Sequence, residues 1–316
     1  DEFLPGEGGY PIETIVEPFV RHKDVIVLGA SGNAGMFKGA EVFAELVKKH
    51  GKPGELILPV TFKTEYKFRH AMPKYNENYI SNGIRTAHDR LKNGSHTSLG
   101  GQLAQIGTNY LRYRNSMDAK LYAEVAKIYV ASAKGDPRKF GGPWGFDSDF
   151  PSFEAIGGWD LIEHDPALTA EDRLAVSNMI LRWTHEAIFA EARGGLRSKG
   201  PVGNHLTHCS MGALMSALYF GKYYSAELPH PAFWLDTVKK NFARQYVHGK
   251  AMDDCDSYHW LTWRHVFVYA LALPDETVFR NGVADQIIKV AGTTMDNLGA
   301  QTPYGDTNVW RSSASD

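Results

Sequence analysis

The sequence predicts a mainly α-helical protein with a small α/β element at its N-terminus. Alternating β-strand patterns are confined to about the first 80 residues, and beyond them long segments with helical periodicity alternate with breaks rich in Gly and Pro. The chain has 316 residues, of which 43% are hydrophobic, so it can bury a large core. We therefore expect an α/β element over residues 1–80 and a helical domain over residues 81–316.

The N-terminal element is predicted to be one β-α-β unit. Residues 24–29 and 55–60 have the apolar composition of short strands, and residues 37–50 have the periodicity of a helix. The glycine-rich segment 29–35 lies between the first strand and the helix, where a dinucleotide-binding turn would hold a phosphate. No acidic residue follows the second strand and no further β-α-β unit follows, so a structural turn is the favoured interpretation.

The helical domain is predicted to consist of antiparallel hairpins. Several segments begin at residues that cap helices, as at Asp118, Ser152, Thr169 and Asp275. Long helices joined by alternately short and long connections are typical of stacked hairpins. No strict sequence repeat indicates a solenoid, so we expect an incomplete (α/α) toroid. The predicted helices span residues 99–115, 118–134, 151–164, 170–192, 205–225, 231–247, 259–273 and 275–297.

Composition excludes some functions and leaves others open. A net charge of −2 gives no basic footprint for nucleic acid, and no apolar run reaches the roughly 20 residues of a membrane span. The chain begins at Asp1 without Met or a signal peptide, which we interpret as processing or trimming. Cys209 and Cys255 are expected to be small buried apolar residues; a disulfide between them is the alternative. The sequence leaves the oligomeric state open.

Two short motifs carry the functional hypothesis. Asn204 and His205 follow a Gly/Pro-rich turn and begin a predicted helix, whose free backbone amides attract anions. About fifty residues later, Tyr258 begins another predicted helix and shares a face with His265, seven residues on. An amide, an imidazole and a phenol suit proton abstraction next to a carboxylate. His208 shares a helix face with His205, but no third residue of suitable spacing completes a metal site.

Further side chains are candidates for substrate binding. Trp144 lies in a predicted loop and Trp159 follows two glycines, so both are candidate platforms for a sugar ring, with core packing as the alternative. Arg193 and Arg197 precede the first motif and could contact an acidic substrate; a solvated basic turn is the alternative. The histidines of the two helices complete the set of candidates: His208, His259 and His265.

These motifs resemble the heparinase II/III and alginate lyase group of polysaccharide lyases. The resemblance covers roughly residues 95–310 and rests on Gly203-Asn204-His205, the helix 207–224, the segment 256–259 and the segment 159–169. It implies an incomplete (α/α) toroid, usually followed by an antiparallel β-sheet domain that is absent from this sequence. It also implies an acidic polysaccharide substrate, a secreted or periplasmic location and no required cofactor, while a divalent metal stays open.

The resemblance implies β-elimination of a uronic-acid-containing polysaccharide. Asn204, helped by His205, would hydrogen-bond the uronate carboxylate as negative charge develops. Tyr258 would be the general acid and a candidate base, and His205 is the alternative base.

Three alternatives remain. A toroid glycoside hydrolase would use paired carboxylic acids, and a carboxylate with a raised pKa in the cleft would favour it. A non-catalytic glycan-binding protein would keep Trp144 and Trp159 without needing Asn204 or Tyr258. A dinucleotide enzyme that uses the glycine-rich segment 29–35 is the remaining alternative. The carboxylates available to the hydrolase are Asp147, Asp149, Asp253, Asp254 and Asp256.

Overall fold

The computed structural model divides the chain into two compact units, Asp1–Lys74 and Tyr75–Asp316. It describes residues 6, 8–20, 23–52, 62–65, 73–94, 96–247 and 256–294. The second unit begins before residue 81 because the hydroxyls of Tyr75 and Tyr79 both donate to the buried carboxylate of Asp118, at 2.6 and 2.5 Å. The protein is mainly α-helical, as the sequence predicts.

The first unit pairs three antiparallel strands with one helix. Strands β1 (Tyr10–Val20), β2 (Lys23–Leu28) and β3 (Phe62–Glu65) form a sheet in the order β2-β1-β3. Helix α1 (Asn33–His50) packs on the sheet at Gly39, where a Cβ would meet Leu28 and Tyr10. The sheet is built around Ile12, which is fully buried and pairs with Leu28 on β2.

The sequence predictions for this unit were correct in part. The predicted strand at 24–29 is β2 and the predicted helix is α1, but β1 was missed because Pro11, Glu13 and Pro18 interrupt its apolar pattern. Residues 55–60 lie outside the described residues. Strand β1 separates β2 from β3 and is antiparallel to both, so the described sheet lacks the adjacent parallel strands of a dinucleotide-binding fold. At Gly35 a Cβ would collide with the carbonyl of Gly9, which supports a structural role for the turn.

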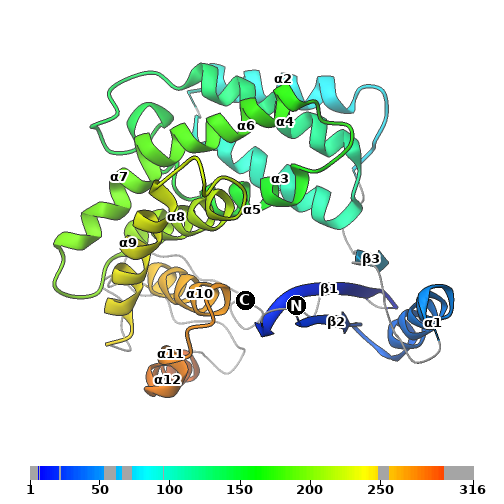
Figure 1. Cartoon of the computed structure of the whole chain (residues 1–316). Helices are drawn as coiled ribbons and strands as arrows, with labels where there is room; N and C mark the ends of the chain where they lie inside the picture. The colour runs from blue at the N-terminus through cyan, green and yellow to red at the C-terminus, as the bar shows by residue number, and fades with distance from the viewer. Residues whose placement is uncertain are drawn as a thin grey trace. The chain divides into compact units, whose positions relative to one another are not determined.

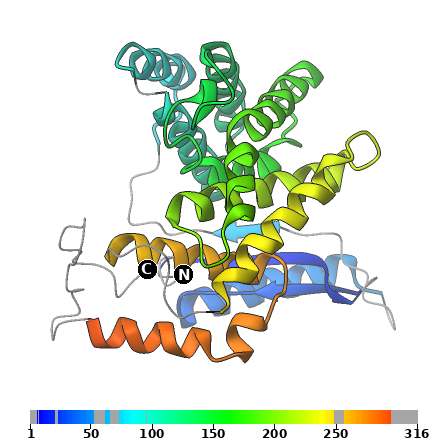
Figure 2. The ribbon, with the colours of Figure 1, turned by 90° about the vertical axis from the view of Figure 1, so that its left-hand side faces the viewer.

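The second unit is a succession of packed helices. Helices α3, α5, α8 and α10 pack one on the next, and α4 packs on α3 and on α6 (Figure 1). Figure 2 shows the unit from another side, with α8 and α9 packed against each other. The helices are α2 (Tyr79–Lys92), α3 (Thr97–Tyr113), α4 (Ser116–Ser132), α5 (Ser152–Ile162), α6 (Ala170–Trp183), α7 (Phe189–Ala192), α8 (Asn204–Tyr223), α9 (His230–Gln245), α10 (Asp256–Ala272), α11 (Thr277–Arg280) and α12 (Val283–Thr294).

Three short irregular helices connect these elements. The 3-10 turn η1 (Gly142–Trp144) lies between α4 and α5, the π-helical turn η2 (Thr184–Ile188) joins α6 to α7, and the 3-10 turn η3 (Arg193–Arg197) precedes α8. Sequence periodicity predicted one continuous helix over 170–192, but the wider π turn divides it. It likewise predicted one helix over 275–297, which breaks at Gly282 with φ +80°.

Close helix contacts depend on glycine. Gly107 of α3 faces Gly158 of α5, and a Cβ on either would lie 2.7 or 2.8 Å from the Cα of the other. Because both positions lack a side chain, the two backbones approach directly, and the first turn of each helix is thereby held near the other. Gly212 of α8 similarly faces Ser152 of α5.

We predict that Gly107→Ala destabilises the protein. The added methyl meets backbone that cannot rotate away, and such overpacking costs about 1–3 kcal/mol. The measurement is the free energy of unfolding in urea. The matched control is Gly101→Ala on the same helix, where a Cβ meets nothing within 4 Å and the better helix propensity of Ala should stabilise by up to about 1 kcal/mol. Equal stability of the two variants would contradict the packing described.

Candidate functional site

The first turns of α3, α5 and α8 converge on one loop segment. The Thr97 hydroxyl at the start of α3 donates to the carbonyl of Phe146, and α5 begins at Ser152 directly after this segment. His205 in the first turn of α8 contacts the ring of Phe150 at 4.9 Å between centroids. Helix N-termini carry unpaired amides and partial positive charge, so this convergence favours an anionic ligand.

A pocket of about 470 Å³ lies between α3 and the start of α5. Hydroxyls, an amide and one carboxyl group line it together with small side chains, a proline and the ring of Phe150, a mixture that suits a sugar ring. Burial raises the pKa of the Glu154 carboxyl to about 7, so this group is partly protonated at neutral pH and can donate a hydrogen bond. The lining residues are Thr97, Ser98, Gly101, Ala104, Gln105, Thr108, Phe150, Pro151 and Glu154.

Two glutamates hold the loop before α5 in place. Glu191 of α7 accepts the amide of Gly141 at 2.5 Å, and Glu186 of the π turn accepts the indole N–H of Trp144 at 3.0 Å. Gly141 has φ +70°, and a Cβ there would collide with the Gly145 carbonyl, so only glycine allows this turn. Asp147 also has positive φ, +60°, which is uncommon for a non-glycine residue and is typical of functional loops.

His205 is the centre of the site. Its side chain is 36% exposed, and its Nδ1 lies 3.7 Å from Asp147 Oδ1 and 4.0 Å from Asp149 Oδ2. Besides Phe150, the rings of Phe140 and Phe146 contact the imidazole at 5.6 and 5.8 Å between centroids. An accessible imidazole with aromatic walls and carboxylates behind it is suited to proton transfer or to metal binding.

The carboxylates behind His205 are crowded and mostly buried. Burial, then the charges of Glu191 and Asp147, raise the pKa of Asp149 to about 7. Burial also raises the pKa of Glu191, although its two oxygens accept the Gly141 amide and the Cys209 thiol. Burial and these carboxylates raise the pKa of the Cys209 thiol well above its ordinary value, so it stays protonated and unreactive. Cys209 is a free thiol, and Cys255 lies outside the described residues.

The contact between α8 and α10 contains two neutral histidines. The His208 ring lies 4.3 Å from that of Phe150 and 4.2 Å from that of His265, and Nδ1 of His265 lies 3.0 Å from the Thr207 hydroxyl. Burial, followed by the neighbouring charges of His205 and Arg264, lowers the pKa of His208 to about 4. Burial also lowers the pKa of His265 well below its ordinary value. Neither imidazole is a cation at neutral pH.

The structure brings some of the predicted catalytic residues together. Asn204 is buried at the start of α8 next to His205. Tyr258 is 36% exposed in the first turns of α10, seven residues and therefore roughly 10 Å before His265 along the helix. The phenol is thus accessible to solvent at the start of a helix that packs on α8. Asp253 and Asp254 lie outside the described residues, as does the side chain of Asp256.

The proposed sugar platforms were wrong. Trp144 and Trp159 are both 0% exposed, and their ring faces are covered by the core. Trp144 packs against Tyr129, and Trp159 stacks on Tyr122 while its N–H donates to the Tyr219 hydroxyl at 2.9 Å. The glycines around Trp144 form a turn of the loop before α5, although the indole itself is buried, and the glycines before Trp159 lie within α5.

Three histidines predicted to bind substrate are also buried. His208 and His265 lie in the contact between α8 and α10, and His259 is enclosed on α10 beside Trp260 and Trp263. None of these three imidazoles lines either of the two pockets, and His208 and His265 pack against each other and against Phe150 and Phe153. Arg193 and Arg197 on η3 are exposed. Their exposure fits both interpretations, a contact with substrate and a solvated turn.

Sequence reasoning missed several residues around His205. Asp147 and Asp149 entered only as carboxylates for the hydrolase alternative, and the surrounding aromatic residues were not selected. The signal that could have identified them is Phe146-Asp147-Ser148-Asp149-Phe150, an Asp-x-Asp flanked by aromatics in a Gly/Pro-rich loop. Glu191 has no local signal, because its partners are distant in the sequence.

Two residue groups have metal-binding geometry. Asp147, Asp149 and His205 form one group, and Asp149, Glu191 and Cys209 form the other, with the ligand atoms in each group within 4.8 Å of one another.

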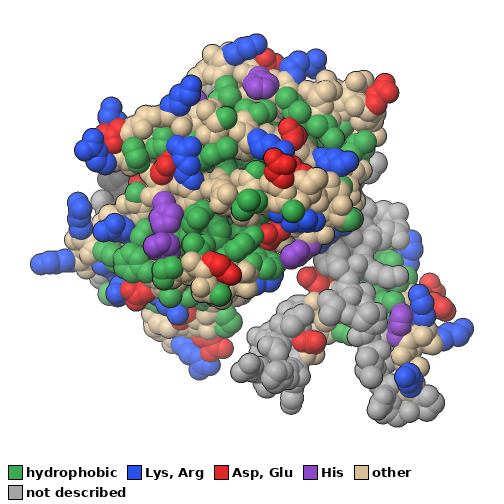
Figure 3. Space-filling view, turned by 45° about the horizontal axis from the view of Figure 1, so that its top comes forward, with side chains coloured by type: hydrophobic (Ala, Val, Ile, Leu, Met, Phe, Trp, Pro, Cys, Tyr) green, Lys and Arg blue, Asp and Glu red, His purple; other side chains and the backbone are tan. Residues whose placement is uncertain are grey.

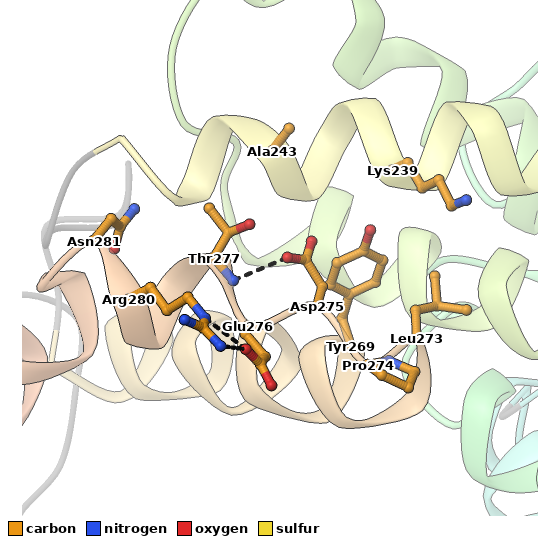
Figure 4. Close-up of a pocket in the computed structure, with 10 residues that line it drawn as sticks. All are labelled: Lys239, Ala243, Tyr269, Leu273, Pro274, Asp275, Glu276, Thr277, Arg280 and Asn281. Atoms are coloured by element: carbon orange, nitrogen blue, oxygen red, sulfur yellow. Dashed lines mark hydrogen bonds and ion pairs between the residues drawn. The ribbon is translucent and has the colours of Figure 1, made fainter. Parts of the chain in front are cut away.

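A second pocket is less suited to chemistry. It is a groove of about 890 Å³ between α9 and the segment from α10 to α11 (Figure 4). Its polar groups mostly bind one another: Arg280 donates to Glu276 at 2.5 Å, and Asp275 accepts the amide of Thr277 at 3.0 Å. We therefore place the candidate site at His205.

The distribution of charge on the surface agrees with the exclusion of nucleic-acid binding that the composition indicates. On the face drawn in Figure 3, Lys and Arg side chains are scattered over the helical unit among acidic ones and do not gather into one basic patch. None of the described helices is both long and apolar enough to span a membrane.

Comparisons with known proteins add no assignment: no family model, no curated protein and no solved structure matches this chain.

We predict that His208 makes stability depend on acid pH. The pKa of His208 is lower in the folded protein, so its contribution to stability is present above the ordinary value of 6.5 and is lost as pH falls toward 4. Between pH 7 and 4.5, wild type should lose on the order of 2 kcal/mol more than His208→Phe, which keeps the ring contacts without titrating. Asp149 and Glu154 act in the opposite direction but are common to both proteins.

Urea unfolding at the two pH values measures this difference. His88→Asn on the exposed face of α2 is the control and should follow wild type. If His208→Phe lost as much stability as wild type between the two pH values, the inference that His208 is neutral in the folded protein would be wrong.

Proposed function

We propose that this protein is a polysaccharide lyase that cleaves a uronic-acid-containing polysaccharide by β-elimination. The observation that carries the proposal is the partly exposed His205 in the first turn of α8, next to Asn204 and in ring contact with Phe150, which lines the pocket between α3 and the start of α5. An accessible imidazole, a neighbouring amide and free backbone amides are the groups that removal of a proton next to a carboxylate requires. A secreted or periplasmic location follows from the extracellular polymer that such an enzyme degrades.

We also propose that the helical unit is an incomplete (α/α) toroid. The supporting observation is the order of packing along the chain, in which α3, α5, α8 and α10 contact one another in succession while α4 packs on α3 and α9 packs on α8. In such an arrangement the inner helices begin at one end of the ring. Tyr258 at the start of α10 would then lie on the same side of the cleft as Asn204 at the start of α8.

The proposed reaction assigns a role to each group. The substrate carboxylate binds at the helix N-termini, where the Asn204 amide stabilises the charge that develops as the proton at C5 is removed. Tyr258 or His205 takes that proton, and Tyr258 gives a proton to the departing glycosidic oxygen. Loss of the C5 proton and the C4–O bond leaves an unsaturated non-reducing end with a C4–C5 double bond, and the protonated glycosidic oxygen becomes the hydroxyl of a new reducing end. Exposed Arg193 and Arg197 are candidate contacts for further acidic sugars.

A glycoside hydrolase is the second candidate. The observation that favours it is the proximity of Asp147 and Asp149, whose carboxylate oxygens lie within 4.8 Å of each other. Paired carboxylates about 5 Å apart serve retaining glycosidases as acid and nucleophile. The two reactions differ in their products, because only elimination creates a conjugated double bond.

We predict that the protein raises the ultraviolet absorbance of a uronate polymer. The panel is alginate, glucuronan, heparan and chondroitin types and rhamnose-containing glucuronates, each incubated with the purified chain. Asn204→Ala and His205→Ala should each lower the rate by about 10²–10⁴-fold, because each removes a group that acts in the transition state. Unchanged thermal unfolding of both variants would show that the loss is chemical.

His88→Asn is the control for the loss of an imidazole and should retain the full rate. New reducing ends without a rise in ultraviolet absorbance would reject the lyase proposal and support the hydrolase. A wild-type rate in both Asn204→Ala and His205→Ala would show that this site takes no part in the reaction.

A further inference from the structure

The three groups Asp147, Asp149 and His205 converge with the geometry of a cation site. Their ligand atoms lie within 4.8 Å of one another, and His205 Nδ1 is 3.7 and 4.0 Å from the two carboxylate oxygens. A cation equidistant from three atoms at such separations lies roughly 2.1–2.5 Å from each, close to the 2.0–2.2 Å of metal–oxygen and metal–nitrogen bonds. Small side-chain movements are enough to reach bonding distance.

A second observation separates this group from an ordinary acidic cluster. Asp147 Oδ1, Asp149 Oδ2 and His205 Nδ1 are all buried atoms, and none has a hydrogen-bond partner within the described part of the chain. Asp149 is only 2% exposed. An unpaired buried carboxylate oxygen is costly, and three such atoms facing one point indicate a ligand between them.

The neighbouring group supplies a comparison. Asp149, Glu191 and Cys209 are equally close, but both oxygens of Glu191 are already bonded, one to the Gly141 amide and one to the Cys209 thiol. Glu191 and Cys209 are therefore already bonded, and through Gly141 they hold the loop that carries Asp147 and Asp149. Groups behind a metal site commonly orient its ligands in this way.

We propose that Asp147, Asp149 and His205 bind one divalent transition-metal cation of the Mn²⁺ or Zn²⁺ class. Two carboxylate oxygens and one imidazole nitrogen suit these ions better than Ca²⁺ or Mg²⁺, which prefer oxygen alone. Three protein ligands leave coordination positions for water or substrate. The side chains of His205 and Asp147 are about one third exposed, at 36% and 33%, so an ion can enter from solvent.

A bound cation would reduce the repulsion between the carboxyl groups of the site and an acidic substrate. Asp147, Asp149 and Glu191 place three carboxyl groups close to His205, and His208 and His265 are neutral. A bound divalent ion offsets most of the negative charge of these groups and can bind the uronate carboxylate directly. This consequence rests on the proposed lyase function. With His205 Nδ1 bound to metal, proton abstraction would fall to Tyr258.

The test measures binding without any substrate. Protein freed of metal by a chelator is titrated with MnCl₂ and with ZnCl₂ by calorimetry, and bound Mn²⁺ is counted by electron paramagnetic resonance. We expect one ion per chain with micromolar or tighter affinity. Asp149→Asn, Asp147→Asn and His205→Ala should each weaken binding at least tenfold. Asp147 and His205 are partly exposed, so their variants keep the test valid if Asp149→Asn fails to fold.

The matched control is Glu154→Gln, which removes a buried carboxylate near the site that is outside the group of three. It should bind as wild type does. No binding to wild type, or equal binding to wild type and the three variants, would overturn the proposal. Metal binding by a chain that cleaves no uronate polymer would support the metal site and reject the lyase, so the two failures are distinct.

Discussion

The Glu191 carboxylate is the contact on which the site depends. One oxygen accepts the Gly141 amide from the loop before α5, and the other accepts the Cys209 thiol of α8. Glu191 therefore connects the loop before α5 to α8, the helix that carries His205. Without this tie, nothing local in the sequence would bring Asp147 and Asp149 to the imidazole, which is more than fifty residues further along the chain. The positive φ of Gly141 is what lets the amide face the carboxylate.

Charge in the site is arranged in two opposing layers. The starts of α3, α5 and α8 present amides and partial positive charge, whereas Asp147, Asp149 and Glu191 gather negative charge behind His205. The buried histidines do not compensate, because burial keeps His208 neutral. Such a site can hold a cation and an anion together, with the metal between the carboxylates of the protein and that of the substrate. The proposed metal site and the proposed elimination are therefore compatible within one site.

The sequence predicted helices well and contacts poorly. The start of α8 follows from Pro201 and Gly203, and the α9 start from Pro231, because these residues act locally. Helix α2 was missed although Ile80, Ile84, Ala87 and Leu91 form an apolar stripe on it. The roles of the tryptophans and histidines could not be predicted, because burial depends on which helices meet. Asn204 and His205 were selected because a turn, a helix start and polar residues coincide there, whereas the positions of Asp147 and Asp149 close to His205 depend on long-range contacts.

We propose that the loop carboxylates and the start of α8 form one catalytic unit. A double-mutant cycle tests this proposal directly, using the initial rate of double-bond formation for wild type, Asp149→Asn, His205→Ala and the double variant. Residues that act as a unit are strongly non-additive. We expect the double variant to be about as slow as the slower single variant, within a factor of about three. Multiplication of the two single effects would contradict it, because Asp149 and His205 would then act independently.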